Sequence, residues 1–166
     1  LRVPQDLHEL RALVVDDSAT ARQMLVDLLE SFTFNVTAVD SGEKAIEALN
    51  RAAADKPYQL VLLDWKMPGM DGIETASRIR KLQHKNPEKA NQGPHTPIII
   101  MVTANVHEAL HKQIDKTTID TLLIKPIKPS LLFNTIMELL GQAKARVSHR
   151  AQQPAAPRPH RLAGKR

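Results

Sequence analysis

The sequence has no cysteine among its 166 residues and few aromatic side chains, with one Trp, one Tyr and three Phe. The absence of cysteine excludes disulfide bonds and thiolate metal sites, and it is typical of a reducing compartment. Because aromatic residues make up only 3% of the chain, its hydrophobic core has to be largely aliphatic. No apolar run approaches the roughly 20 residues of a membrane span, and no signal peptide is visible, so we expect a cytoplasmic domain.

Acidic residues are absent from the end of the chain. Glu138 is the last one, and seven Lys and Arg residues follow it. Removing these seven charges from the net charge of +5 leaves −2 for the residues before Lys144. A mildly acidic body with a basic end does not indicate a nucleic-acid-binding domain, so we expect no direct contact with nucleic acid.

The length suits one domain with tails. We expect residues 1–10 to be an N-terminal lead-in, residues 11–141 to form the domain, and residues 142–166 to be a flexible, basic, Pro/Ala-rich tail or linker. Because the chain begins with Leu1 rather than Met, we also expect it to be a piece of a larger protein.

Short apolar runs alternate with helical patterns between these tails. Leucine-rich or β-branched runs predict five strands, at Arg11–Asp16, Phe34–Val39, Leu60–Leu63, Pro97–Val102 and Ile119–Ile124. Apolar residues at helical spacing predict five helices, at Ala19–Ser31, after a cap at Ser41, after a cap at Asp71, at Val106–Ile114 and at Pro129–Leu140. The polar segment Gln83–Thr96 is expected to be a long exposed loop. Apolar strands between helices indicate an α/β protein with a parallel sheet covered on both faces.

Polar side chains follow four of the five predicted strands. Asp16 and Asp17 end the first strand, Asp64 the third, Thr103 the fourth and Lys125 the fifth. The carboxyl ends of parallel strands meet at one edge of the sheet, where such folds bind their ligands. Three neighbouring carboxylates disfavour one another's charge, and a hard cation such as Mg²⁺, which takes oxygen ligands, relieves this. Lys125 and Thr103 add a cation and a hydroxyl donor for an anion.

Each of these residues also has a structural explanation when it is taken alone. Asp16-Asp17 could form a turn or cap a helix, Thr103 could cap the helix after it, and Lys125 could be a solvated charge. Their joint placement at four strand ends favours a shared binding site.

Four motifs make the sequence resemble the receiver domains of two-component response regulators, over about Arg11 to Leu140. They are Val14-Val15-Asp16-Asp17, Leu63-Asp64-Trp65-Lys66-Met67-Pro68-Gly69-Met70-Asp71-Gly72, Val102-Thr103-Ala104 and Lys125-Pro126. The resemblance implies a doubly wound, flavodoxin-like fold with strand order 2-1-3-4-5 and five flanking helices. It also implies a cis peptide bond between Lys125 and Pro126.

The same resemblance implies a role for each residue of the shared site. Asp64 would be the phosphoacceptor, and Thr103 and Lys125 would hold the phosphoryl oxygens. Mg²⁺ would be bound by Asp17, Asp64 and the backbone carbonyl of Lys66, with Asp16 acting through water. A histidine kinase or a histidine phosphotransfer domain would supply the phosphoryl group from a phosphohistidine, and phosphorylation would change the conformation of the domain.

The segments 6–13 and 64–75 look like receivers embedded in hybrid sensor histidine kinases. We therefore expect a kinase parent, which could be anchored in a membrane although this domain is not. The domain itself would not be a conventional enzyme, since it would catalyse only its own phosphorylation and dephosphorylation. One departure from many receivers is Leu122, which stands where they carry a Tyr or Phe three residues before the lysine.

Two other functions remain open from the residues. An aspartyl-nucleophile phosphohydrolase on a similar fold would have a second acid two residues after its nucleophile, a position that Lys66 occupies here. A binding module that signals without phosphate would not need the complete set of five polar residues. Both features favour the phosphoacceptor hypothesis.

Overall fold

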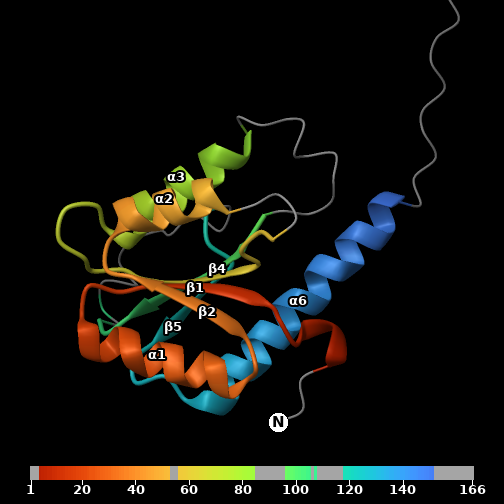
Figure 1. Cartoon of the computed structure of the whole chain (residues 1–166), viewed down its shortest axis with the longest axis horizontal. Helices are drawn as coiled ribbons and strands as arrows, with labels where there is room; N and C mark the ends of the chain where they lie inside the picture. The colour runs from red at the N-terminus through yellow and green to blue at the C-terminus, as the bar shows by residue number, and fades with distance from the viewer. Residues whose placement is uncertain (1–3, 53–55, 85–95, 106, 108–117, 152–166) are drawn as a thin grey trace, which may run out of the picture.

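The computed structural model describes residues 4–52, 56–84, 96–105, 107 and 118–151. Five parallel strands form one sheet in the order β2-β1-β3-β4-β5, as expected (Figure 1). The strands are β1 (Arg11–Val15), β2 (Asn35–Val39), β3 (Leu60–Asp64), β4 (Ile98–Thr103) and β5 (Thr121–Ile124). The carboxyl ends of β1 and β3 lie at the left of Figure 1, so the sheet edge that should carry the site is on that side.

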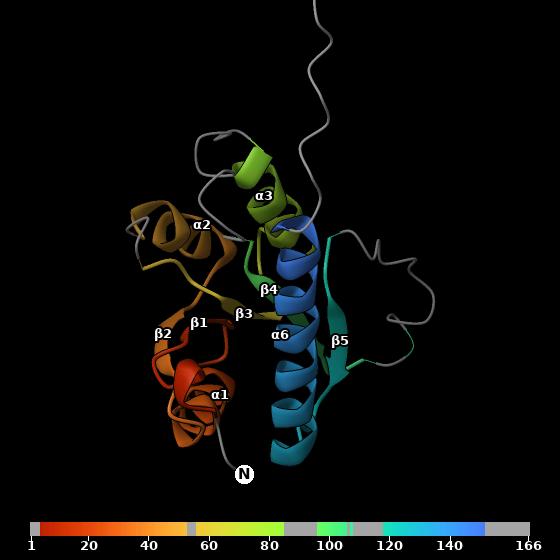
Figure 2. The ribbon, with the colours of Figure 1, turned by 90° about the vertical axis from the view of Figure 1, so that its right-hand side faces the viewer.

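Helices cover both faces of this sheet. They are the 3₁₀ helix η1 (Gln5–Leu7) and the α-helices α1 (Ala19–Ser31), α2 (Gly42–Arg51), α3 (Gly72–His84) and α6 (Pro129–Ala151). In Figures 1 and 2, α2 and α3 lie on one side of the strands and α1 on the other, and Figure 1 shows that α6 shares the side of α1. Both expected caps are confirmed, because Ser41 Oγ accepts from Lys44 N at 3.2 Å and Asp71 Oδ1 from Glu74 N at 2.9 Å.

The alternation of side chains along the strands divides the core into two clusters. In β1 to β4, even-numbered strand residues pack against α1 and α6, whereas odd-numbered ones pack against α2 and α3; in β5 the parity is reversed, with Leu123 in the first cluster and Leu122 beside the second. In β1, for example, Val14 belongs to the first cluster and Leu13 and Val15 to the second. Every residue of β3 and β4 is buried, which explains why both strands are apolar up to their last residue.

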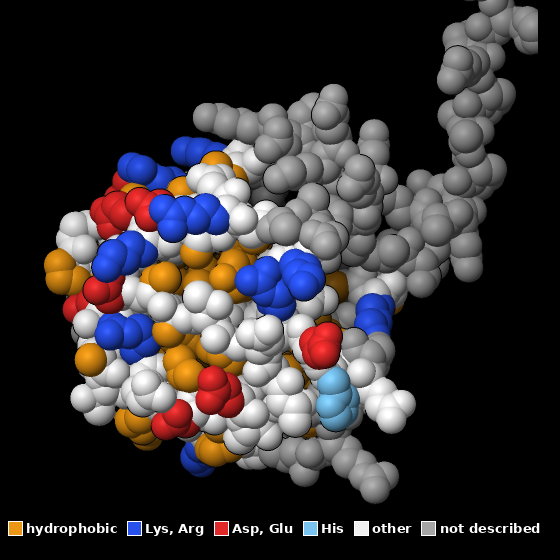
Figure 3. Space-filling model, viewed as in Figure 1, with side chains coloured by type: hydrophobic (Ala, Val, Ile, Leu, Met, Phe, Trp, Pro, Cys, Tyr) orange, Lys and Arg blue, Asp and Glu red, His pale blue; other side chains and the backbone are white. Residues whose placement is uncertain are grey.

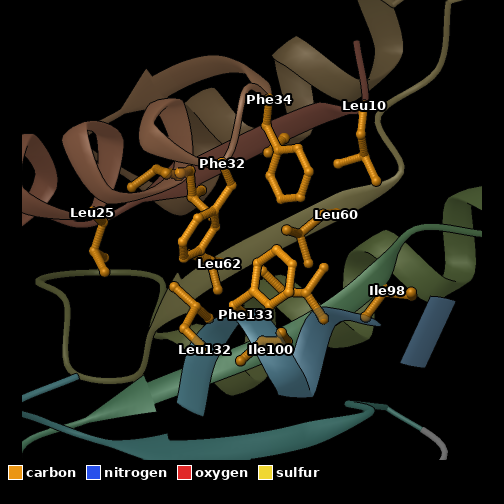
Figure 4. Packing of buried hydrophobic residues seen from close by; sticks show 14 of the residues in the cluster. Leu10, Leu25, Phe32, Phe34, Leu60, Leu62, Ile98, Ile100, Leu132 and Phe133 are labelled. Atoms are coloured by element: carbon orange, nitrogen blue, oxygen red, sulfur yellow. The ribbon is translucent and has the colours of Figure 1, made fainter. Parts of the chain in front are cut away.

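All three phenylalanines of the chain belong to the cluster between the sheet and α1 and α6 (Figure 4). Phe32 makes edge-on contacts with Phe34 and Phe133, with ring centroids 6.0 Å and 5.1 Å apart. The remaining members shown in Figure 4 are aliphatic, including Leu60, Leu62 and Ile100. The prediction of a largely aliphatic core is therefore confirmed.

The most distinct correction concerns the last helix, which was expected to end at Leu140. It continues to Ala151, so the first ten residues of the expected tail are helical. The first proline after the start of α6 is Pro154, and the residues before it include Ala, Lys and Arg, which are good helix formers. Whether residues 142–166 act as a tail or linker stays a prediction, and residues 152–166 lie outside the described part.

The strands end or begin within one residue of the prediction, except β5, which starts at Thr121 rather than Ile119. There Ile99 N donates to the Asp120 side chain at 2.8 Å rather than to a backbone carbonyl. Regular pairing between β4 and β5 therefore begins at Thr121, the residue after Asp120.

The helix expected at 106–114 falls outside the described residues apart from His107. Most of the expected loop at 83–96 does too, although Gln83 and His84 belong to α3. No helix in the described part of the chain is long and apolar enough to cross a membrane.

Candidate functional site

The strand register brings the predicted site residues to one edge of the sheet. Val15 of β1 pairs with Leu63 of β3, so Asp16 lies beside Asp64. Asp64 pairs with Val102 of β4, which is followed by Thr103. Thr103 pairs with Ile124 of β5, which is followed by Lys125. Neighbouring strands thus end in a carboxylate, a second carboxylate, a hydroxyl and an ammonium.

Lys125 contacts two of the carboxylates directly. Its Nζ lies 3.1 Å from Asp16 Oδ2 and 3.3 Å from Asp64 Oδ1. Asp16 is fully buried and Asp64 is 7% exposed, so both ion pairs lie in a region of reduced water access. The cation therefore offsets charge that water cannot solvate there. The peptide bond between Lys125 and Pro126 is cis, as the resemblance implied.

The carboxylates of Asp16, Asp17 and Asp64 form a group suited to a metal ion. Each offers an oxygen, and these oxygens all lie within 4.8 Å of one another. Asp17 is exposed, so the group opens toward solvent on one side. An all-oxygen donor set with an open side fits Mg²⁺, which keeps several waters when proteins bind it. Lys66 lies two residues beyond Asp64, and its carbonyl remains a predicted ligand.

Asp64 carries the clearest electrostatic signature of the site. Its burial, together with the negative charge of Asp16, raises the pKa of Asp64 to about 6, although Lys125 acts in the opposite direction. Burial alone would lower the pKa of Lys125. Its hydrogen bond to Asp16 and the charges of both carboxylates outweigh this, so the Lys125 pKa is raised above its usual value. Without further positive charge, Asp64 thus keeps its proton up to a higher pH than an ordinary Asp does.

Thr103 is 1% exposed and fixed at the end of β4. Its Oγ1 accepts a hydrogen bond from Asn105 N at 3.1 Å, and its carbonyl accepts one from Lys125 N at 2.8 Å. A hydroxyl that accepts a hydrogen bond keeps its own proton for donation. Thr103 can therefore offer this proton to an anion bound beside Asp64.

Sequence analysis missed two groups that hold Asp16 in place. Ser18 N donates to Asp16 Oδ1 at 2.9 Å, and Arg22 Nη1 donates to the Asp16 carbonyl at 2.8 Å. Ser18 also caps α1, since its Oγ accepts from Ala21 N at 3.3 Å. The spacing of Ser18 before the helix could have revealed the cap, whereas no motif marks Arg22.

The surface near this edge carries both signs of charge. In Figure 3, Lys and Arg side chains alternate with Asp and Glu side chains along the left-hand margin, on the side where β1 and β3 end in Figure 1. No uniformly basic patch covers the described part of this face.

Comparison with known proteins identifies the family. Residues 12–137 match the response regulator receiver domain family. The chain is 31% identical over 118 residues to the two-component response regulator ORR5 of Oryza sativa subsp. japonica, with 71% of this chain and 79% of that protein covered. It is 30% identical over 141 residues to probable histidine kinase 4 of the same organism. That match covers 78% of this chain but only 14% of the kinase.

Two solved structures agree with these relatives. The response regulator TrrA of Thermotoga maritima, in complex with Mg²⁺-BeF, matches with a TM-score of 0.61 at 27% identity, covering 78% of this chain and 97% of that one. The chemotaxis protein CheY4 of Vibrio cholerae matches with a TM-score of 0.62 at 25% identity, covering 78% of this chain and 98% of CheY4. With its parallel sheet, its strand order and the extent of the family match, this chain belongs to the response regulator receiver domains of two-component systems.

Proposed function

We propose that this receiver domain accepts a phosphoryl group on Asp64, with Mg²⁺ as its cofactor. The donor would be a phosphohistidine on a histidine kinase or a histidine phosphotransfer domain. One observation carries the proposal. Asp64 is a nearly buried carboxylate with two further carboxylates on one side and the Lys125 ammonium 3.3 Å from its Oδ1. This combination supplies a nucleophile, a cation site and a charge partner at one point.

In the proposed reaction, a carboxylate oxygen of Asp64 attacks the phosphorus of the phosphohistidine. The phosphorus–nitrogen bond breaks, and its electron pair stays on the imidazole of the partner. The product is an acyl phosphate on Asp64. Lys125 offsets negative charge on the transferring oxygens, and Thr103 donates its hydroxyl proton to one of them. Positioning and electrostatics thus provide most of the catalysis.

The donor set supports the choice of cofactor. Mg²⁺ bound there would supply positive charge shared between the carboxylates and the phosphoryl oxygens. Asp16, Asp17, Asp64 and the Lys66 carbonyl would hold it, directly or through water. Because the metal-free pocket raises the pKa of Asp64, binding of a cation also favours the ionised form that acts as the nucleophile.

Phosphorylation would change the balance of charge beside Thr103. An acyl phosphate brings about −1.5 to −2 units of charge and strong acceptor oxygens. These oxygens can draw the Thr103 hydroxyl inward and move the segment that follows β4. The conformational change that carries the signal would therefore begin at the end of β4.

Intact mass spectrometry tests the proposal. Incubation with a small phosphodonor and Mg²⁺ should add one phosphoryl mass, while Asp64→Asn or added chelator should abolish the addition. Asp27→Asn is the matched control, because Asp27 is an exposed carboxylate on α1 that contacts Gln23 outside the site. Persistent labelling of Asp64→Asn, or equal loss in Asp27→Asn, would contradict the assignment.

The larger protein remains a separate question. Stand-alone regulators and histidine kinases match this chain at nearly the same identity, 31% and 30%. We propose a hybrid kinase parent on the sequence pattern described above. A cytoplasmic location is part of the same proposal.

A further inference from the structure

The first turn of α2 packs against the start of α3 with no room for a side chain. A Cβ added to Gly42 would lie 2.2 Å from Thr75 Oγ1 and 2.9 Å from Met70 Sδ. Carbon atoms do not approach other heavy atoms this closely without one of them moving. Gly42 therefore permits a direct contact between α2 and the segment that follows Asp64.

A second glycine continues this contact to the phosphoacceptor strand. A Cβ on Gly72 would lie 2.4 Å from the carbonyl oxygen of Asp64 and 2.9 Å from Trp65 Cα. Gly72 N also donates to the Trp65 carbonyl at 2.8 Å. The first turn of α3 thus rests on the backbone of Asp64 and Trp65. Through Gly42 and Gly72, the layers α2, α3 and the end of β3 are stacked in direct contact.

We propose that Gly42 is a positioning residue for the Mg²⁺ site, although it lies outside the pocket. Its contact with Met70 and Thr75 fixes residues 66–72, the segment that carries the predicted Lys66 carbonyl ligand. Gly42 would thereby determine how precisely that carbonyl faces Asp64. This inference rests on the proposed function, because the metal is part of that function.

The groups that Gly42 contacts cannot easily move aside. Thr75 is fully buried, and its hydroxyl donates to the Asp71 carbonyl at 2.7 Å. Met70 is 7% exposed and lies inside the segment itself. A side chain at position 42 would therefore displace the segment toward or away from Asp64 rather than only turn a surface rotamer.

Gly42→Ala should weaken Mg²⁺ binding about tenfold, the lower end of the loss seen when groups that orient metal ligands are changed. A Mg²⁺ titration followed by fluorescence would measure this, because Trp65 is the single Trp of the chain, adjoins Asp64 and is 1% exposed. Gly141→Ala on α6 is the matched control, since an added Cβ there would meet no described atom within 4 Å beyond its chain neighbours and its own helix backbone. It should bind Mg²⁺ as the unmodified protein does.

A compensating change distinguishes this contact from general damage. Thr75→Ala removes the oxygen that is the nearest atom an alanine at position 42 would meet, although Met70 Sδ remains 2.9 Å away, so Gly42→Ala/Thr75→Ala should bind Mg²⁺ more tightly than Gly42→Ala alone. Thr75→Ser keeps that oxygen and should give no rescue. Circular dichroism on each variant would confirm that the compared proteins are folded.

The possible outcomes separate this inference from the function beneath it. If the unmodified protein binds Mg²⁺ and Gly42→Ala binds it equally well, the positioning role is wrong and the metal site stands. If the unmodified protein ignores Mg²⁺, both fall. Should Gly42→Ala fail to fold, Met70→Ala takes its place, because it removes the side chain by which the segment reaches α2. Unchanged affinity in folded Met70→Ala would overturn the proposal.

Discussion

Asp64 is held in a pocket that opposes its charge, and this has a consequence for stability. Its pKa is about 6 in the folded protein against 3.8 for an ordinary Asp. Between about pH 4 and pH 6, the folded protein keeps a proton that the unfolded chain has released. The stability that Asp64 contributes is therefore complete below about pH 4 and is lost as pH rises through 6. The metal-free fold carries a cost at neutral pH.

Asp64→Asn should remove this cost. A shift of about two pKa units corresponds to up to ~3 kcal/mol, so the unfolding free energy of the metal-free variant should exceed that of the unmodified protein by up to that amount at pH 7. At pH 4 the two should converge. Urea denaturation in chelator at both pH values measures the difference. An Asn variant that is less stable at pH 7 would contradict this prediction, because it would show that the attraction between Asp64 and Lys125 exceeds the cost of burying the Asp64 charge.

Sequence predicts these site residues because of one geometric rule, that parallel strands end at a common edge. Asp16, Asp64, Thr103 and Lys125 each follow an apolar run, so the edge could be assembled from the chain alone. Arg22 and Gly42 could not be found in this way. Arg22 contacts a backbone carbonyl, which no sequence motif marks. Gly42 leaves room for Thr75, a residue far along the chain, and only the structure shows that a side chain at position 42 would collide with it.

The ends of β4 and β5 are the elements through which phosphorylation would act. Leu122 of β5 is half-buried against the cluster beside α2 and α3, and it has neither the ring nor the hydroxyl of the aromatic residue common there. An aromatic contact contributes ~0.5–1.5 kcal/mol beyond its buried area, and that bias is missing here. Phosphate contacts to Thr103 and Lys125 would have to supply most of the switching energy.

Thr103→Ala should therefore abolish the conformational response, whereas Leu122→Ala should leave it largely intact. Amide chemical shifts with and without beryllofluoride, a phosphoryl mimic, would measure the response in the residues after β4. If both variants lose the beryllofluoride-induced shift changes equally, Leu122 takes part in the conformational change and this prediction is wrong.

Helix α6 contributes to stability through one face only. Ile136 is fully buried against the sheet, whereas Leu131 on the same helix is 50% exposed. Ile136→Ala should lower the unfolding free energy by roughly 2–5 kcal/mol, because it leaves a cavity in the core. Leu131→Ala should change it by only about 0.5 kcal/mol. Chemical denaturation of both variants gives the comparison, and similar losses would contradict the described packing.

The whole molecule consists of a sheet with two separate cores and a basic extension. The alternation of strands and helices follows from the sequence because each strand is apolar and bounded by helix-forming segments, whereas the strand order was implied by the resemblance to receiver domains. The end of α6 did not follow, since the basic, Pro/Ala-rich composition of residues 142–166 predicted a flexible tail although no proline intervenes before Pro154. Local composition alone does not decide where an exposed helix ends.

Deleting residues 142–166 should leave the domain intact. Among the described side chains, the last core residue of α6 is Leu140. The unfolding free energy of the truncated protein should lie within about 0.5 kcal/mol of that of the full chain, and its Mg²⁺ affinity should be unchanged. Urea denaturation and the Trp65 titration would measure both. A large loss of stability would mean that the extension packs on the domain.

The geometry of α6 also has a mechanical consequence. The helix starts at Pro129, four residues after Lys125, and runs for 23 residues, or about 35 Å. Its far part extends past the sheet in Figure 1. A rod of this length that tilts by about 5° at its start moves its free end by about 3 Å. The turns of α6 up to Leu140 lie in the core, so a tilt about the start of the helix displaces Ala151 far more than it displaces the packed turns.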